Sequence, residues 1–547
     1  MSYIWGRALP TSIDDSSFVL SQIQACRLTS HRNYVLIAVA AITLLGFLVR
    51  WWTLADHELW LDELLTGAFA HYPAKTIIFG VIDTTPPLYY LLHKIFVFPA
   101  DDVVSMRLLP LIFGTMTIPV IFLLGRSIAG NAVGLWAAAM LAVWDIHVHH
   151  SQDARAYALL FLLVALSATA LAHGMRLPGT RRTLLYGTAA ALAALAFATH
   201  FTAILWICIL GATMLLDARF SSRAAGAGPA VLRAAVIGLF LSLPTVFHLL
   251  VATSTQSFSW LKVPTFNGLL ATWQVLFGPR GEIGIANSIL AASMVCGGIA
   301  VLSRRGNWQA AILLGCLAAI PAMEFLVSQL KPILMVRTAI VSVIGCIVAS
   351  AIVLAALPRM AAGVLGGLVV AGQMYALAVP QTAVTARNGV AEGASYLTDN
   401  VSAGDVVVFA SPMAHAVFVP RLPGNFEGRL LTGNWSAGKL RDYGVPAADH
   451  VPWQHRYLST AHVPNGENPF AEYRPTEPLD PFDQAVRGGD AIWFVQRQGA
   501  VRKLTPDMVA KASGLQPVLV QEIGRYEILR FGPSLGDRDR SGKAVDG

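Results

Sequence analysis

The chain has 547 residues, of which 55% are hydrophobic and only 13% are charged, and its mean hydropathy is +0.58. Its apolar residues come in runs of about 20, which match the hydrocarbon core of a bilayer. The net charge of +7 and the pI near 9.2 do not indicate a nucleic-acid-binding protein, because the arginines are scattered between these runs instead of clustered on one face. The composition therefore predicts a polytopic α-helical protein of a lipid bilayer.

The N-terminal segment, residues 1–33, is polar and precedes the first apolar run, Tyr34 to Trp52. That run is too long for a removable signal peptide and lacks a small-residue cleavage site. We interpret it as a signal anchor with its N-terminus in the cytoplasm, so that the loop 53–107 faces outward. Within this loop, the apolar stretch Leu88 to Phe98 is short for a span. It either crosses the membrane or lies along its surface.

The positive-inside rule distinguishes the two placements, because each choice inverts every later loop. A surface position gives about eleven spans, at residues 34–52, 108–124, 132–143, 157–172, 184–198, 203–216, 234–251, 286–302, 310–327, 339–356 and 362–379. The basic connectors then share the cytoplasmic side, and their arginines are Arg126, Arg176, Arg181, Arg182, Arg219, Arg223, Arg233, Arg304, Arg305 and Arg359. We therefore predict a transmembrane domain at residues 34–380.

The same assignment gathers the polar segments that are richest in potential chemistry on the outward side. They are the loop 53–107, Asp145 to Tyr157, Thr253 to Gly284, and Leu330 to Arg337. The sequence thus predicts an active site at the outer membrane face.

After Pro380 the composition changes to short strand-like runs separated by helical ones. The predicted strands are Asp405 to Ala410, Ala491 to Gln496 and Pro517 to Phe531, and the predicted helices are Asn388 to Thr398 and Thr505 to Ala512. We expect a periplasmic α/β domain at residues 383–532 and a disordered polar tail at 533–547. All five cysteines precede residue 380, which excludes a disulfide framework in this domain.

Paired acids follow the first span. Asp62 and Glu63 come directly after Trp60 and Leu61, and a carboxylate near hydrocarbon is costly unless it is paired or functional. An aspartate held there can act as a general base toward a hydroxyl, although ordinary solvated loop acids remain the alternative. Asp83 precedes two threonines and two prolines, so turn formation and ligand binding are equally good interpretations.

Cations stand at two further outward positions. Arg155, next to Asp153 in the segment SQDARAY, either pairs locally and snorkels or offers its guanidinium to a phosphate. Lys331 and Arg337 flank a short apolar segment at the outer end of a span, as a clamp for an anionic group would.

Other polar residues give weaker signals. His147, His149 and His150 lack a fixed metal-ligand spacing, so a metal site there is the weaker interpretation. Most polar residues near the spans fit satisfied packing groups, but Glu324 falls within a span and calls for a test.

In chain order, these motifs form a combination: the Asp-Glu pair, PPLYYLL at 86–92, Arg-Leu-Leu-Pro at 107–110, SQDARAYAL at 151–159, and a late Lys-Pro followed by an arginine. The combination resembles the GT-C glycosyltransferases over residues 34–380. The nearest group is the bacterial relatives of dolichyl-phosphate-mannose protein mannosyltransferases and of the aminoarabinose transferase acting on lipid A.

The resemblance implies an enzyme of the bacterial inner membrane that moves a sugar from a polyprenyl-phosphate donor to a lipid, glycan or protein acceptor at the periplasmic face. By this likeness Asp62 is the catalytic base and Glu63 its partner, while Arg155, Lys331 and Arg337 hold the donor phosphate. The full substrate-binding set is Asp83, Tyr89, Arg107, Asp153, Arg155, Tyr157, Lys331 and Arg337. No metal ligand or cofactor is required, although a divalent metal ion is compatible.

One residue departs from the pattern, because the late motif commonly reads Arg-Tyr in this family and here Thr338 follows Arg337.

The expected chemistry is a single displacement. A sugar on a polyprenyl phosphate carries its own leaving group, so the enzyme has to deprotonate the incoming hydroxyl and neutralise the charge that develops on the phosphate. Attack from the face opposite the phosphate inverts the anomeric carbon. Two other classes share the composition. A lipid or glycan transporter or flippase is expected to carry polar groups at the bilayer midplane and paired interrupted helices, and a non-catalytic scaffold would tolerate neutral changes at its charged residues.

Overall fold

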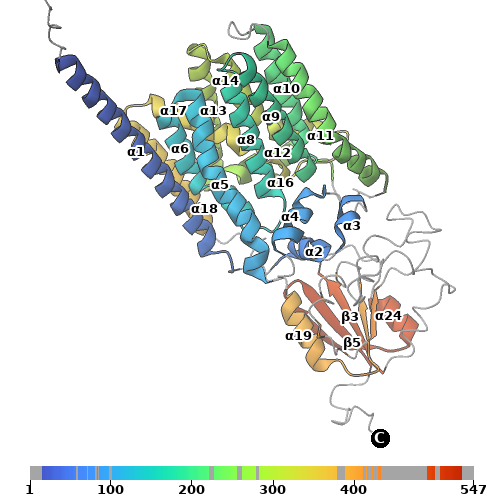
Figure 1. The fold of residues 1–547 in the computed structure, drawn as a ribbon. Helices are drawn as coiled ribbons and strands as arrows, with labels where there is room; N and C mark the ends of the chain where they lie inside the picture. The colour runs from blue at the N-terminus through green and yellow to red at the C-terminus, as the bar shows by residue number, and fades with distance from the viewer. Residues whose placement is uncertain are drawn as a thin grey trace, which may run out of the picture.

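The structure is a computed structural model that describes residues 15–56, 59–70, 72–79, 83, 85–97, 102–220, 227–255, 262–278, 282–378, 389–410, 414, 418, 422, 423, 426, 429–432, 490–498 and 506–532. Figure 1 shows a bundle of helices with a small sheet at one end. The predicted class, a polytopic helical membrane protein with a C-terminal α/β part, is confirmed.

Among the described residues, eight helices are long and apolar enough to cross a membrane. They lie within α1 (Asp15–Trp52), α5 (Val103–Ala129), α8 (Tyr157–Gly174), α9 (Gly179–Thr199), α10 (Ala203–Phe220), α11 (Gly228–Thr255), α13 (Glu282–Arg304) and α18 (Arg359–Ala378). Two bent pairs bring the number to ten. The shorter apolar helix α17 (Ser342–Ala356) matches the remaining predicted span, so the count of about eleven stays a prediction.

Of the two bent pairs, the first bends where the predicted span 132–143 ends, and the second breaks the predicted span 310–327. α6 (Asn131–Ala142) and α7 (Asp145–Ser151) meet at 63°, and α14 (Trp308–Ala318) and α15 (Ile320–Ser328) meet at 49°. Pro321 stands at the start of α15 and has no amide to donate back to α14, which explains the second break. At these breaks the chain carries polar side chains at positions where an unbroken span would carry apolar ones.

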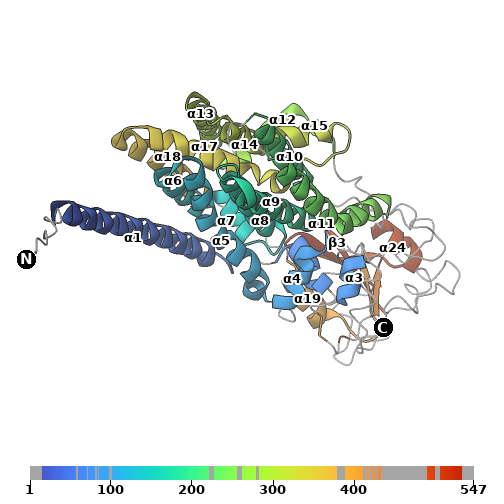
Figure 2. The ribbon, with the colours of Figure 1, turned by 45° about the horizontal axis from the view of Figure 1, so that its top comes forward.

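The loop 53–107 folds into three short helices at the sheet end of the bundle, α2 (Leu61–Ala70), α3 (Ala74–Phe79) and α4 (Leu88–Phe96). Both Figure 1 and Figure 2 place α3 and α4 at that end. α4 has nine residues, too few to cross a bilayer. Pro87 precedes it, at a helix start where a missing amide does no harm.

The C-terminal part contains a five-stranded sheet with the order β2-β1-β3-β5-β4. Its elements are α19 (Val390–Asn400), β1 (Val406–Phe409), β2 (Arg429–Thr432), β3 (Ile492–Arg497), α24 (Pro506–Ser513), β4 (Pro517–Ile523) and β5 (Tyr526–Phe531). Strands β2, β1 and β3 are parallel, whereas β5 runs antiparallel to β3 and β4. The predicted run from 517 to 531 is two strands joined at Gly524, whose φ is +59°.

The central strands are buried on both faces, which explains why their sequences are apolar without alternation. One face, with Val407 and Trp493, packs with α19, and the other, with Val408 and Phe494, packs with α24. The core on the α19 side also includes Leu59, Leu64, Met106 and Ala154 from the helical part. The sheet therefore rests on the segments that carry Asp62 and Arg155. The predicted tail 533–547 lies outside the described residues.

Candidate active site

The candidate active site lies at the sheet end of the bundle, where two distant segments meet. Asp62, in the first turn of α2, accepts a hydrogen bond at 3.1 Å from Nη1 of Arg337, which belongs to the short helix α16 (Val336–Ala339) 275 residues later. The two side chains keep 21% and 26% of their surface exposed. The Arg337 guanidinium also lies 6.0 Å from the centre of the Trp60 ring. This ion pair is therefore open to a ligand.

A second cation, Arg155, is buried beside this pair in the turn before α8. It donates to the Tyr90 hydroxyl at 2.9 Å and lies 3.4 Å from a carboxylate oxygen of Asp83. The Tyr90 hydroxyl also donates to Asp83, and Thr66 accepts from Arg155 at 3.3 Å. Arg155 thus ties together α2, α4 and the segment before Pro86.

The neighbouring acid Glu63 makes a different kind of contact. Its two oxygens accept from Nε and Nη2 of Arg107 on α5, both at 2.8 Å, and both side chains are buried. The same oxygens accept from the backbone amides of Ala154 and Trp60, at 2.9 and 3.1 Å. The contact with the amide three residues earlier caps the start of α2. Glu63 and Arg107 therefore lock α2 against α5 and the turn at Ala154.

Asp153 and its neighbours line the back of the site. The carboxylate accepts from the Trp60 indole at 2.9 Å and lies 3.4 Å from Nδ1 of His150. Burial raises the pKa of Asp153, but the contact with His150, the nearby His149 and the hydrogen bond from Trp60 together lower it by more, so the net shift is downward. The Tyr157 ring packs 4.9 Å from the His150 ring. The hydroxyl of Tyr89, the residue beside Tyr90, is buried and has no hydrogen-bond partner among the described residues.

Partial exposure distinguishes Asp62 as the acid suited to exchange a proton, because Glu63, whose pKa burial also raises, is enclosed against Arg107. Burial raises the pKa of the Asp62 carboxyl, and the cations Arg155 and Arg337 oppose this shift. A carboxylate with a raised pKa is a better base toward a hydroxyl.

The structure does not place the three predicted phosphate ligands alike. Arg155 and Arg337 both lie beside Asp62, whereas Lys331 is exposed on the connector between α15 and α16. The Nε of Arg337 is buried and has no hydrogen-bond partner among the described residues. The contacts of Arg337 with the described chain therefore leave one of its guanidinium donors unused.

Several residues of the site escaped the sequence analysis. Thr66, Thr85 and Tyr90 all contact Arg155, and only Tyr90, inside the PPLYYLL motif, carried a local signal. Arg50, inside the first span, was not singled out. It is fully buried and donates to the Leu141 and Ala142 carbonyls, at 3.1 and 2.8 Å.

These carbonyls lie in the last turn of α6, just before the bend toward α7, where the Leu141 carbonyl also accepts from the Trp144 amide at 3.3 Å. Arg50 also approaches His147 Nδ1 at 2.8 Å and Ser151 Oγ at 3.2 Å. A Cβ built on Gly114 would lie 2.0 Å from Ser151 Oγ, so only glycine allows this approach. Arg50 thereby holds the bend between α6 and α7, the helix that precedes Asp153.

Metal binding at the histidines finds no support in the described part of the chain. No three His, Cys, Asp or Glu residues come together there as metal ligands. His147 contacts Arg50, and His150 contacts Asp153.

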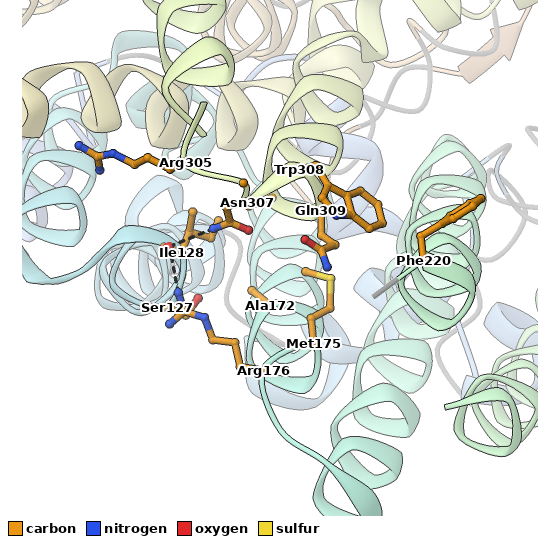
Figure 3. Close-up of a pocket in the computed structure, with 12 residues that line it drawn as sticks. Ser127, Ile128, Ala172, Met175, Arg176, Phe220, Arg305, Asn307, Trp308 and Gln309 are labelled. Carbon is orange, nitrogen blue, oxygen red and sulfur yellow. Dashed lines mark hydrogen bonds between the residues drawn. The ribbon is translucent and has the colours of Figure 1, made fainter. Parts of the chain in front are cut away.

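A cavity of about 430 Å³ lies at the opposite end of the bundle (Figure 3), at the ends of α5, α8 and α10 and the turn before α14. Two of its polar residues are engaged with the protein, because Arg176 and Asn307 both donate to the Ile128 carbonyl, at 2.9 and 3.4 Å. In Figure 3, Arg305 points away from Trp308. The cavity does confirm that these predicted inward connectors lie at one end of the bundle.

Solved structures resemble this chain over nearly its whole length. ArnT from Cupriavidus metallidurans matches with a TM-score of 0.59 in the apo state, at 11% identity over 92% of this chain and 98% of ArnT. ArnT bound to undecaprenyl phosphate matches with a TM-score of 0.56, at 12% identity over 91% and 98% of the two chains. The chain has the GT-C fold.

The Archaeoglobus fulgidus oligosaccharyltransferase in the apo form shares this fold more distantly, with a TM-score of 0.50 and 11% identity over 85% of this chain and 69% of that one. No protein-family model matches the sequence, and neither does a curated protein. At these identities the likeness establishes the GT-C fold alone. The activity has to be argued from the site.

Proposed function

We propose that this protein is a glycosyltransferase that moves a sugar from a polyprenyl-phosphate donor to a hydroxyl of its acceptor. The meeting of Asp62 and Arg337 carries the proposal. It joins a carboxylate that can accept a proton to a guanidinium whose Nε has no hydrogen-bond partner among the described residues, at the sheet end of a GT-C bundle. The structure of ArnT with undecaprenyl phosphate supports a lipid phosphate as the anion.

Each group near Asp62 has a role in this reaction. Asp62 accepts the proton of the attacking hydroxyl while the bond between the anomeric carbon and the phosphate oxygen breaks. Arg337 and Arg155 stabilise the negative charge that the leaving polyprenyl phosphate gains, with Lys331 as a further contact at the entrance. Attack from the face opposite the phosphate inverts the anomeric centre.

The remaining predicted site residues shape the site. Glu63 and Arg107 neutralise each other in the interior, so we assign them to holding α2 in place instead of touching the substrate. Asp83 and Asp153 orient Arg155 and Trp60, respectively. Tyr89 and Tyr157 pack behind the site. No step is assigned to a metal ion.

We further propose the orientation that the positive-inside rule predicts. The N-terminus and the arginine-rich connectors lie in the cytoplasm, and the site and the sheet face the periplasm of a bacterial inner membrane. The packing of the sheet core against Leu59, Leu64 and Ala154 favours a role for residues 383–532 in forming the acceptor side of the site.

The experiment that tests this function uses purified protein in proteoliposomes, with a panel of radiolabelled polyprenyl-phosphate sugars and membrane extracts as acceptors. Asp62→Asn should reduce transfer by about 10²- to 10⁴-fold. The melting temperature and the affinity for undecaprenyl phosphate should change little, because asparagine has the same shape. Near-normal turnover by Asp62→Asn would reject the assignment of the base.

A transporter is the second candidate, since two pairs of bent helices interrupt the bundle. The charged residues of the site, however, lie on the short helices and turns at one end of it. Movement of a labelled lipid across the proteoliposome membrane without sugar transfer, and unaffected by Asp62→Asn, would favour transport.

A further inference from the structure

Arg337 is held in place by the residue that follows it. Thr338 is buried, and its Oγ1 lies 2.8 Å from Oε2 of Glu324 on α15. The same Oγ1 accepts from the backbone amide of Met335 at 3.1 Å, which closes the turn that begins α16. One hydroxyl therefore links the turn carrying Arg337 to a membrane helix.

Glu324 has no other evident use. It is completely buried within the bent pair α14–α15, and its Oε1 has no hydrogen-bond partner among the described residues. The ion pairs of the described chain do not include it. A carboxyl placed in a span without a cation is costly, and such residues are retained mainly for a function.

The turn of α15 that follows adds a second attachment. Ser328, four residues after Glu324 and hence on the same face of the helix, accepts hydrogen bonds from the amides of Ile333 and Leu334, both at 2.9 Å. Residues 333–338 are therefore attached to α15 at both of their ends. Their free side presents Arg337 to Asp62.

We propose that Glu324 is a positioning residue for the donor site: through Thr338 it fixes Arg337 where the phosphate of a polyprenyl-phosphate substrate binds. This inference rests on the proposed function. It also gives Thr338 a role of its own at the position where the sequence departs from the Arg-Tyr pair.

The test measures binding of undecaprenyl phosphate to the purified full chain. Glu324→Leu and Thr338→Val remove the hydrogen bond and should each weaken binding about tenfold. Glu324→Gln and Thr338→Ser retain an acceptor and a hydroxyl, so they should bind within about twofold of the unaltered protein. Asp217→Asn, at an equally buried span carboxyl far from the site, should lower stability but not this affinity.

A double-variant cycle separates positioning from a general loss of structure. If Glu324 acts through Arg337, Glu324→Leu should weaken binding far less when Arg337→Gln is already present. Additive losses, unchanged binding in Glu324→Leu and Thr338→Val, or equal losses in the conservative variants would each overturn the inference. Failure of the unaltered protein to bind undecaprenyl phosphate would instead overturn the proposed function, and the inference with it.

Discussion

The two ends of the helical bundle both pair an arginine with an aspartate, but they do so in different surroundings. At the far end, Arg182 and Asp217 are buried, with 3.8 Å between their nearest charged atoms, and Tyr186 donates to Asp217 at 2.7 Å. At the sheet end, Arg337 and Asp62 are partly exposed at 3.1 Å.

The comparison shows what sets a functional ion pair apart from one that holds helices together. Arg182 also donates to the Leu177 carbonyl at 2.9 Å, so the far-end pair completes the end of a helix. Arg337 instead has an Nε without a hydrogen-bond partner in the described part of the chain, and both side chains of its pair with Asp62 are partly exposed. Charge alone therefore does not mark a site in this protein, and the pair of Arg337 and Asp62 differs from the far-end pair by its exposure.

The largest loss of stability is expected at the sheet end, in the pair of Glu63 and Arg107, because this pair is buried like the one at the far end. Glu63→Gln leaves the Arg107 charge buried without its partner and should cost about 3–5 kcal/mol of stability. The measurement is thermal unfolding of the purified protein in detergent, beside Asp62→Asn. The prediction is that Glu63→Gln unfolds at a clearly lower temperature and that its neighbour does not.

A double replacement is the control for this variant. Glu63→Leu combined with Arg107→Met removes both charges, so it should be more stable than Glu63→Gln. Equal melting of Glu63→Gln and the unaltered chain would show that the pair does not lock α2.

An intermediate effect is expected in the pH dependence of transfer. Activity requires ionised Asp62, so it is present above the pKa of Asp62 and lost as the pH falls through it. Arg337 lowers this pKa against the effect of burial, and its removal must raise it. In Arg337→Gln the acid limb of kcat/KM against pH should therefore move to higher pH. If the acid limb stays in place or moves to lower pH, Arg337 does not lower the pKa of the catalytic base.

The smallest effect is expected from a cation at the far end. Arg305 is exposed beside the cavity there, and Arg305→Gln should change stability by less than about 0.5 kcal/mol. Affinity for undecaprenyl phosphate should also stay unchanged, since the site lies at the other end of the bundle. If Arg305→Gln weakened the binding of undecaprenyl phosphate as much as Arg337→Gln, the proposed difference between the two ends would be wrong.

The sequence determined the features that depend on local composition. Apolar runs predicted the membrane helices, because any stretch that crosses hydrocarbon has to be apolar and helical whatever surrounds it. The runs at 405–410 and 491–496 predicted β1 and β3, since strands covered on both faces are apolar throughout. β2 was not predicted, because its segment RLLT has only two apolar residues, whereas β1, of equal length, is apolar throughout.

Only the tertiary structure decided which charged residues act together. The neighbours Asp62 and Glu63 are adjacent acids in the sequence, yet one opens to the site and the other is buried against Arg107. Likewise, Arg337 contacts Asp62, which lies 275 residues earlier in the chain. The link from Thr338 to Glu324 that holds this arginine in place is not predicted by any local sequence pattern. Hydrophobicity is summed along a segment and can be read from it, whereas ion pairs depend on which segments meet in space.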